Sequence, residues 1–132
     1  MLAVQTESSV HEAYIAGLID TLGTIGIRSG REQIQPYILI RHKSKAFIDD
    51  IAKTLSFGRT YHYGGRYYAC QCFGVQKVYD ILSQCIDFLN YRKKVANLVL
   101  RFCTSRLNNS YQPLTLSELK LVSEITREVK KK

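Results

Sequence analysis

A chain of 132 residues with 45% hydrophobic side chains is long enough to bury the core of one domain. Its 19 Lys and Arg against 11 Asp and Glu give a net charge of +8, a balance that favours a phosphate-rich partner over a neutral metabolite. No apolar run reaches the roughly 18 residues of a membrane span, and residues 1–9 lack a signal-peptide pattern. We therefore expect an intracellular, soluble protein without a membrane partner.

The four cysteines form neither a dense disulfide framework nor a recognisable metal centre. Cys70 and Cys72 would share one face of a strand, but no nearby His or Cys completes a four-ligand zinc site. Cys85 and Cys103 lack paired metal-ligand spacings. We therefore expect reduced, packed thiols, no metal site and no bound cofactor.

The first expected helix covers about residues 10–22. A capping-box pattern at residues 9–12 marks its start, because the serine oxygen can cap the first turn while the glutamate reaches back. Ala13, Ala16 and Gly17 put small side chains on adjoining turns, which indicates that another backbone comes close. The spacing alone leaves open whether that backbone belongs to the same chain or to a second copy.

Two hairpins are expected where apolar and polar residues alternate. The first pairs a strand over residues 24–28 with one over 37–41, across a polar turn. The second pairs residues 59–63 with 66–73 around a Gly-Gly turn. The strand residues expected to point away from the helices are Arg28, Arg41, Arg59 or Thr60, Arg66 and Tyr68, with Tyr67 and Phe73 on the opposite face.

Apolar stripes of helical period predict four further helices. Ser44 can cap a helix between the two hairpins. Two more helices are expected over residues 75–89 and from residue 91 onward, the latter with a cationic start, and a last one over about 115–130 begins with a second capping box. The order α-ββ-α-ββ-α plus C-terminal helices predicts an α+β fold, in which helices back one face of a four-stranded antiparallel sheet.

Residues 14–25 (YIAGLIDTLGTI) resemble the signature of the LAGLIDADG homing-endonuclease family, at the end of a helix that leads into a strand. Six of the nine motif positions agree, namely Ala16, Gly17, Leu18, Ile19, Asp20 and Gly23. Residues 47–51 and 89–100 are similar to the single-motif, homodimeric branch of that family. The likeness covers about residues 10–107, the expected core of a single domain that spans residues 1–132.

The resemblance implies a homodimer on nucleic acid. In this family two motif helices pack through their small residues, and the two sheets form a saddle over the bound nucleic acid. The resemblance therefore assigns Ala13, Ala16, Gly17 and Asp20 to the dimer interface. A twofold protein of this kind suits a pseudo-palindromic site.

The family's catalytic acid stands at the penultimate motif position, where one carboxylate from each subunit holds divalent metal against the scissile phosphates. This sequence has Leu22 there, and leucine offers no lone pair to a cation. Asp20 lies about 200° around the helix from that position, so local hydrogen bonding at the helix end is its expected role. The motif is degenerate, and we expect no intact catalytic residue.

Other positions indicate phosphate binding. Arg92 falls where the family has a lysine near the reacting phosphate, and His42 falls near a glutamine that organises water; with Asp20 they are the candidate remnants of an active site. The residues expected to bind nucleic acid are Arg28, Arg41, His42, Arg59, Arg66, Tyr68, Arg92 and Lys93.

Two functions remain open at this stage. The first is a nucleic-acid-binding homodimer that does not cleave and acts as an RNA- or DNA-binding or structural factor. The alternative is an active, intron-encoded, site-specific DNA endonuclease that uses a divalent metal such as magnesium. Arginine and tyrosine serve RNA and DNA equally well, so the sequence does not choose between duplex DNA and structured RNA.

Overall fold

The computed structural model describes residues 7–29 and 33–130, and its elements follow the order expected from the sequence. The helices are α1 (Glu7–Leu22), α2 (Lys45–Leu55), α3 (Val75–Cys85), the short 3-10 helix η1 (Ile86–Phe88), α4 (Lys93–Asn108) and α5 (Leu116–Lys130). The strands are β1 (Gly23–Ser29), β2 (Ile34–His42), β3 (Tyr61–Gly64) and β4 (Tyr67–Phe73). The expected polar turn between β1 and β2 lies partly outside the described residues.

The four strands form one antiparallel sheet in the order β1-β2-β4-β3. Ile25 pairs with Ile38, and Ile38 pairs with Cys72, so one row of apolar side chains crosses three strands. These side chains are at most 4% exposed and lie on the covered face of the sheet. Because successive side chains of a strand point to opposite faces, the residues between them form the other side, which we call the open face.

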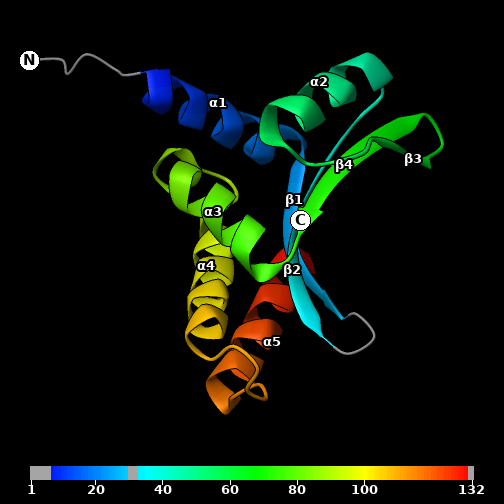
Figure 1. The fold of residues 1–132 in the computed structure, drawn as a ribbon. Coiled ribbons are helices and arrows are strands. Elements are labelled where there is room, and N and C mark those ends of the chain that lie inside the picture. The colour runs from blue at the N-terminus through cyan, green and yellow to red at the C-terminus, as the bar shows by residue number, and fades with distance from the viewer. Residues whose placement is uncertain (1–6, 30–32, 131–132) are drawn as a thin grey trace, which may run out of the picture.

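The helices gather on one side of the sheet and leave its other side uncovered (Figure 1). Each amphipathic helix turns an apolar stripe toward this common core: α2 buries Ile48 and Ile51, and α4 buries Val99 and Phe102. Burial of each such side chain stabilises the fold by about 1.5–3 kcal/mol relative to an exposed one. The stripes thus hold the sheet from one side only, and the open face is available for contacts outside the chain.

Two expected helix caps are confirmed and one is wrong. Ser44 Oγ accepts the N–H of Phe47 at 3.2 Å. At the start of α5, the N–H of Glu118 donates to Thr115 Oγ1 at 3.1 Å, and the N–H of Thr115 donates to Glu118 Oε1 at 2.9 Å, which is a reciprocal capping box. The expected box at residues 9–12 is not a helix start, because α1 begins at Glu7 and already includes residue 9.

All four cysteines are free and buried, as expected. Burial raises the pKa of Cys70 to about 11 and that of Cys85 and Cys103 to about 12, so these thiols stay protonated at neutral pH. Within the described residues there is no group of three or more His, Cys, Asp or Glu side chains that could hold a metal ion. No helix in the described ranges is long and apolar enough to cross a membrane.

Candidate nucleic-acid interface

The open face is built from aromatic and cationic side chains that alternate with the buried residues of each strand. Its aromatic members are Tyr37 on β2, Tyr61 and Tyr63 on β3, and Tyr67 and Phe73 on β4. Tyr63 is 44% exposed and Phe73 is 49% exposed, so their rings reach solvent although they stand on a packed sheet. The face therefore combines flat apolar surfaces with positive charge.

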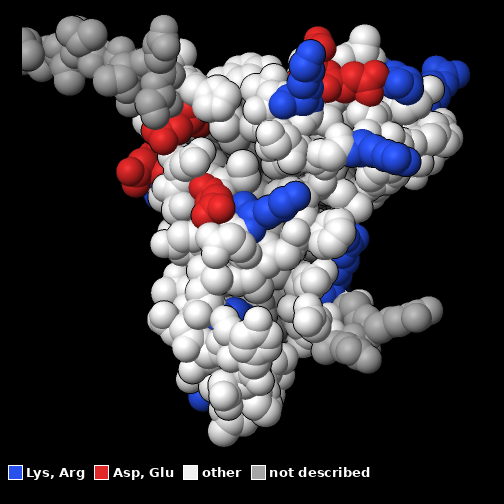
Figure 2. All heavy atoms as spheres, in the orientation of Figure 1, with Lys and Arg blue, Asp and Glu red and all other residues white. Residues whose placement is uncertain are grey.

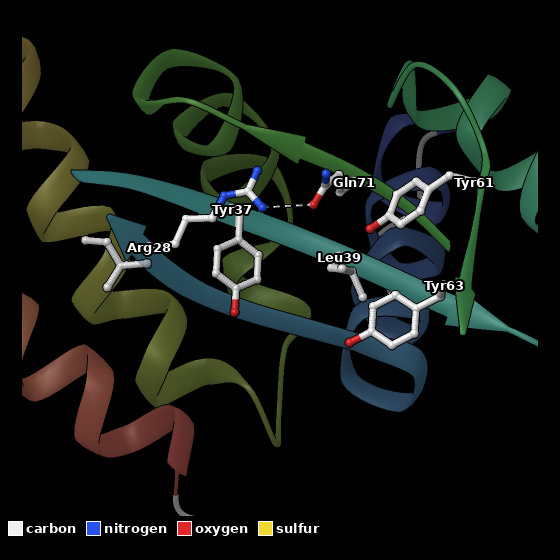
Figure 3. A pocket seen from close by; sticks show the side chains of 7 residues that line it. Arg28, Tyr37, Leu39, Tyr61, Tyr63 and Gln71 are labelled. Carbon is white, nitrogen blue, oxygen red and sulfur yellow. Dashed lines mark hydrogen bonds between the residues drawn. The ribbon is translucent and has the colours of Figure 1, made fainter. Parts of the chain in front are cut away.

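Arg28 is held across the sheet by rings from two other strands. Its guanidinium carbon lies 5.5 Å from the ring centroid of Tyr37 and 5.2 Å from that of Phe73. Its Nη1 also donates to Gln71 Oε1 at 3.5 Å, so the side chain extends from β1 over β2 to β4 (Figure 3). Cation–π contacts of this kind contribute about 0.5–1 kcal/mol each at exposed sites.

The position of Tyr37 depends on Gly26, its partner on β1. A Cβ at Gly26 would lie 2.8 Å from the phenol oxygen of Tyr37, so the ring covers the space that the glycine leaves. Burial raises the pKa of Tyr37, although the nearby Arg28 charge opposes this effect. The phenol is consequently a neutral hydrogen-bonding group at neutral pH.

Arg41 repeats this arrangement at the other end of the sheet. Its guanidinium carbon lies 5.4 Å from the ring centroids of both Tyr63 and Tyr67. The Lys43 ammonium lies 5.9 Å from the Tyr67 ring as well. In Figure 2, basic side chains lie over α2 and the β3–β4 hairpin and along the edge of the sheet, with acidic ones beside them over α2 and others toward α1 and α3.

A hollow of about 470 Å³ opens in this face between the two arginine clusters. We call it the tyrosine hollow; its lining is Ile27, Arg28, Tyr37, Leu39, Tyr61, Tyr63 and Gln71 (Figure 3). Its lining combines the Arg28 guanidinium, the Gln71 amide and three phenols with the apolar side chains of Ile27 and Leu39. Burial raises the pKa of Tyr61 and the adjacent Tyr63 adds to the effect, which keeps this phenol neutral.

At the amino-terminal end of the sheet, Asp20 joins α1 to the start of α4. Its Oδ2 accepts the N–H of Asn90 at 2.7 Å, and its Oδ1 accepts the N–H of Arg92 at 2.9 Å. The expected local hydrogen bonding of Asp20 is therefore wrong, since both partners lie in a distant segment of the chain. Leu22, two residues later, packs against the hydrophobic core as a half-buried side chain.

Comparison with solved structures identifies the fold. The chain is similar to homing endonuclease I-CvuI in complex with a DNA target, with a TM-score of 0.76 and 19% identity over 97% of this chain and 87% of that chain. It is similar to the archaeal intron-encoded homing endonuclease I-Vdi141I complexed with DNA, with a TM-score of 0.75 and 21% identity over 96% and 88% of the two chains. The LAGLIDADG meganuclease I-AabMI bound to uncleaved DNA gives a TM-score of 0.70 and 15% identity over 86% of this chain and 43% of that chain.

The chain has the LAGLIDADG homing-endonuclease fold. The sequence itself matches no family model and no curated protein. The fold expected from the motif is thus confirmed by the similarity to these solved structures. With the frame of a LAGLIDADG fold in place, each residue expected to act in it can be located.

Among the expected binding residues of this LAGLIDADG fold, Arg28 and Arg41 lie on the open face, and Arg59 and Arg66 flank it. Arg59 precedes β3 and Arg66 lies in the turn between β3 and β4, both exposed. The expected position of Tyr68 is wrong. It pairs with His42 and shares the covered face with Cys70 and Cys72, because those two apolar side chains fix the phase of β4.

His42 and Arg92 lie in different parts of the fold, and their side chains make different contacts. His42 Nδ1 accepts the N–H of Ser44 at 3.0 Å, and its ring lies 4.6 Å from that of Phe47, so it acts at the start of α2. Arg92 is half-buried immediately before α4, and its Nε has no hydrogen-bond partner among the residues that the structure describes. The neighbouring Lys93 is exposed.

Sequence reasoning missed most of the aromatic residues of the open face. It placed Tyr67 and Phe73 opposite the expected binding residues, and it did not single out Tyr37, Tyr61 or Tyr63. The signal was present in β4, where Cys70 and Cys72 alternate with Gln71 and Phe73 and are the residues suited to burial. If Cys70 and Cys72 are taken to mark the covered face of β4, the alternation of the strand assigns Tyr67 to the open face.

The residues expected at the dimer interface differ in their exposure in the single chain. Ala13 and Gly17 are exposed on α1, next to Tyr14, which is 50% exposed. Ala16 is 0% exposed and packs in the chain's own core, so its side chain is not available to a partner. Asp20 is half-buried and holds the α4 segment, as described above.

Proposed function

We propose that the protein is a nucleic-acid-binding homodimer that does not cleave its partner and acts as an RNA- or DNA-binding or structural factor. The observation that carries the proposal is the open face, on which Arg28 and Arg41 stand among exposed aromatic rings with no helix covering them. The net charge of +8 supplies long-range attraction to phosphates. Solved structures of the same fold are complexes with DNA, which supports a nucleic-acid partner for this face.

The residues at the motif end do not fit a divalent metal. The side chain of Leu22, at the position of the family's acid, has no donor atom, and both carboxylate oxygens of Asp20 already accept backbone N–H groups. A hard cation needs several oxygen ligands, and neither residue offers them. This donor set supports binding without phosphodiester cleavage.

The outward stripe of α1 supports association of two chains. Val10, Ala13, Tyr14, Gly17 and Thr21 are exposed at helical spacing along one side of the helix. I-AabMI, of which this chain covers 43%, is long enough to contain a second unit of the same size, which two copies of the present chain would match. A symmetric dimer would place two open faces side by side.

Binding is tested by removing the cations of the open face. We expect the Arg28→Ala/Arg41→Ala double variant to raise the Kd for nucleic acid by about tenfold or more and to reduce the salt slope by about 2. The matched control, Lys120→Ala/Arg127→Ala, removes the same charge from the exposed side of α5. Fluorescence anisotropy at several salt concentrations measures both; equal losses in the two variants would mean that the open face is not the binding surface.

Cleavage is tested with the unmodified protein and magnesium. We expect every phosphodiester of duplex DNA and structured RNA to remain intact, because no carboxylate stands at residue 22. The Leu22→Asp variant restores that carboxylate in each subunit and is expected to gain magnesium binding measurable by calorimetry. Reproducible, magnesium-dependent, site-specific cleavage by the wild-type protein would overturn the proposal in favour of an active DNA endonuclease.

A further inference from the structure

The surroundings of Arg28 are polar but uncharged. Arg28 pairs with Gln35 across β1 and β2, and its Nη1 donates to Gln71 Oε1 (Figure 3). Its guanidinium also lies against the rings of Tyr37 and Phe73. No carboxylate among the described residues forms an ion pair with it. The positive charge is therefore not neutralised within the described part of the chain, and the two rings and the Gln71 amide hold the side chain in place.

The hydrogen bond to Gln71 leaves most of the guanidinium donors of Arg28 free. The N–H groups of arginine lie in one fixed plane, and a parallel pair of them can donate to the O6 and N7 atoms of guanine in the major groove. Within the described residues only Nη1 is engaged, so the edge formed by Nε and Nη2 is available. A side chain that is already held loses less conformational freedom on binding. Arg28 thus combines a held position with a free pair of parallel donors.

Arg41 makes ring contacts of the same kind but has no polar partner. Its guanidinium carbon lies 5.4 Å from the rings of Tyr63 and Tyr67, and no described residue accepts a hydrogen bond from it. The Lys43 ammonium lies 5.9 Å from the Tyr67 ring, so two cations stand near one ring. Clustered cations favour the phosphate backbone, whose contacts hold a protein on nucleic acid without reading its sequence. The two ends of the open face are therefore suited to different parts of a duplex.

The tyrosine hollow places the donors of Arg28 beside apolar surface. Arg28 and Gln71 both line it, together with Leu39 and the rings of Tyr61 and Tyr63. Water competes less for hydrogen bonds made beside such a surface. The sheet has no helix over this side, and strands can enter the major groove of B-form DNA, whereas the major groove of duplex RNA is too deep and narrow for side chains to read. These features favour a base edge of duplex DNA as the ligand of Arg28.

We infer that Arg28 reads a guanine in the major groove of duplex DNA, that Gln71 is its positioning residue, and that Arg41 contributes phosphate binding without base preference. The inference rests on the proposed function, because it names the base and the form of nucleic acid that the same face takes. In a homodimer the two copies of Arg28 would meet guanines at twofold-related positions, one on each strand of a pseudo-palindromic site.

The test is selection by the full chain from a pool of duplex DNA with a randomised core, followed by sequencing. We expect the wild type to enrich G·C pairs at two twofold-related positions, where a change to A·T raises the Kd by about tenfold. Arg28→Lys keeps the charge but loses the fork, so this preference should fall to about twofold or less while the salt slope of binding stays the same. The matched control is Arg41→Lys, which should change the affinity for all sequences alike and keep the guanine preference.

Variants of Gln71 test its positioning role. Gln71→Leu removes the acceptor and should reduce the guanine preference by about threefold without changing the salt slope. Gln71→Glu supplies an acceptor again and should recover the preference, although its negative charge lowers the affinity for every sequence. A merely structural role would not produce this recovery. Equal guanine preference in the wild type and Gln71→Leu would contradict the positioning role.

A second substitution at Arg28 provides an independent measurement. Arg28→Gln presents an amide, whose donor and acceptor match the N7 and N6 groups of adenine, so the preference at the same two positions should shift from guanine toward adenine. Thermal melting by circular dichroism checks that each variant is folded. A folded Arg28→Gln variant that still selects guanine would overturn the inference.

The outcomes separate this inference from the proposed function. Duplex binding without enriched guanines, or enriched guanines that Arg28→Lys selects as strongly as the wild type, would overturn the inference and leave nucleic-acid binding in place. Binding of a structured RNA but not of the DNA pool would also overturn the inference alone. Absence of binding to both the DNA pool and the structured RNA would overturn the proposed function together with the inference.

Discussion

Both carboxylate oxygens of Asp20 accept backbone N–H groups from the segment that leads into α4. Asn90 and Arg92 lie just before the first residue of α4, Lys93, so the carboxylate stands near the positive end of the helix dipole, which is a favourable interaction. Asp20 therefore joins the end of the motif helix to an element that follows about half a chain later. A motif residue can thus be explained by structure alone, and the side chain two residues later, Leu22, is apolar.

Replacing Asp20 by alanine is expected to destabilise the fold by roughly 1.5–3 kcal/mol, because two hydrogen bonds to a charged group are lost and water replaces them only in part. Urea unfolding followed by circular dichroism measures this change. The control is Asp50→Ala on the exposed side of α2, which should stay within about 0.5 kcal/mol of wild type. Similar losses in the two variants would show that the Asp20 bonds add little.

At the scale of elements, local pattern predicted which segments are helices and strands, and it predicted the Ser44 cap and the box at the start of α5. It placed Tyr68 on the wrong face, because the expected alternation put Arg66 and Tyr68 together on the outward face, whereas Arg66 lies in the turn and the burial of Cys70 and Cys72 determines the face of Tyr68. A shift of one residue moves every side chain to the other face. The register between strands brings Phe73 next to Arg28. It depends on packing across the whole sheet, so the spacing of residues within one segment does not predict it.

The junction of α4 and α5 depends on one buried carboxylate. Glu118 is 0% exposed; Ser105 Oγ donates to its Oε2 at 2.7 Å, and Arg106 Nη1 donates to its Oε1 at 2.9 Å. Burial by itself would raise the pKa of Glu118, but the N–H of Thr115, Ser105 and Arg106 outweigh it and lower the pKa below its usual 4.5. The ionised form is thus the one that the fold stabilises.

This lowered pKa gives a pH dependence with a defined sign. The stabilisation is fully present above the usual carboxyl value of 4.5 and is lost as the pH falls through the lower folded-state pKa. Glu118→Gln should therefore cost about 1–3 kcal/mol in urea unfolding at neutral pH, and the difference from wild type should shrink in acid. Glu124→Gln, on the exposed side of the same helix, is the control. A difference that stays constant from neutral to acidic pH would contradict this account.

At the scale of the whole molecule, the sequence predicted a helix-backed sheet and the motif predicted its fold, because both follow from patterns within single segments. The aromatic character of the candidate binding surface did not follow, since the rings around Arg28 come from β2 and β4 and meet only in the folded sheet. The dimer interface stays a prediction. Small residues indicate a close approach of two backbones, but only burial shows that Ala16 faces the chain's own core and that Gly17 faces outward.

Gly17 provides a direct test of dimerisation, because the folded chain itself does not require a glycine there. A Cβ at this position would meet nothing within 4 Å, and the residue lies in the middle of α1. Leucine is favoured over glycine in a helix by up to about 1 kcal/mol, so Gly17→Leu should leave the monomer as stable as wild type or more so. If α1 packs closely against its copy, the added side chain should force the two helices apart and shift the protein toward monomer.

The contrast with Gly23 separates loss of the dimer from loss of the fold. A Cβ at Gly23 would lie 2.8 Å from the carbonyl oxygen of Ile19 and 2.9 Å from its Cα, and backbone atoms cannot move aside cheaply. Gly23→Ala should therefore lower the thermal melting temperature, whereas Gly17→Leu should change only the mass measured by light scattering after size-exclusion chromatography. Wild-type protein that elutes as a monomer across the accessible concentration range would rule out the α1 dimer. A Gly17→Leu variant that stays dimeric would place the interface elsewhere, because no close helix pair centred on residue 17 could accommodate two leucines at its twofold axis without moving apart.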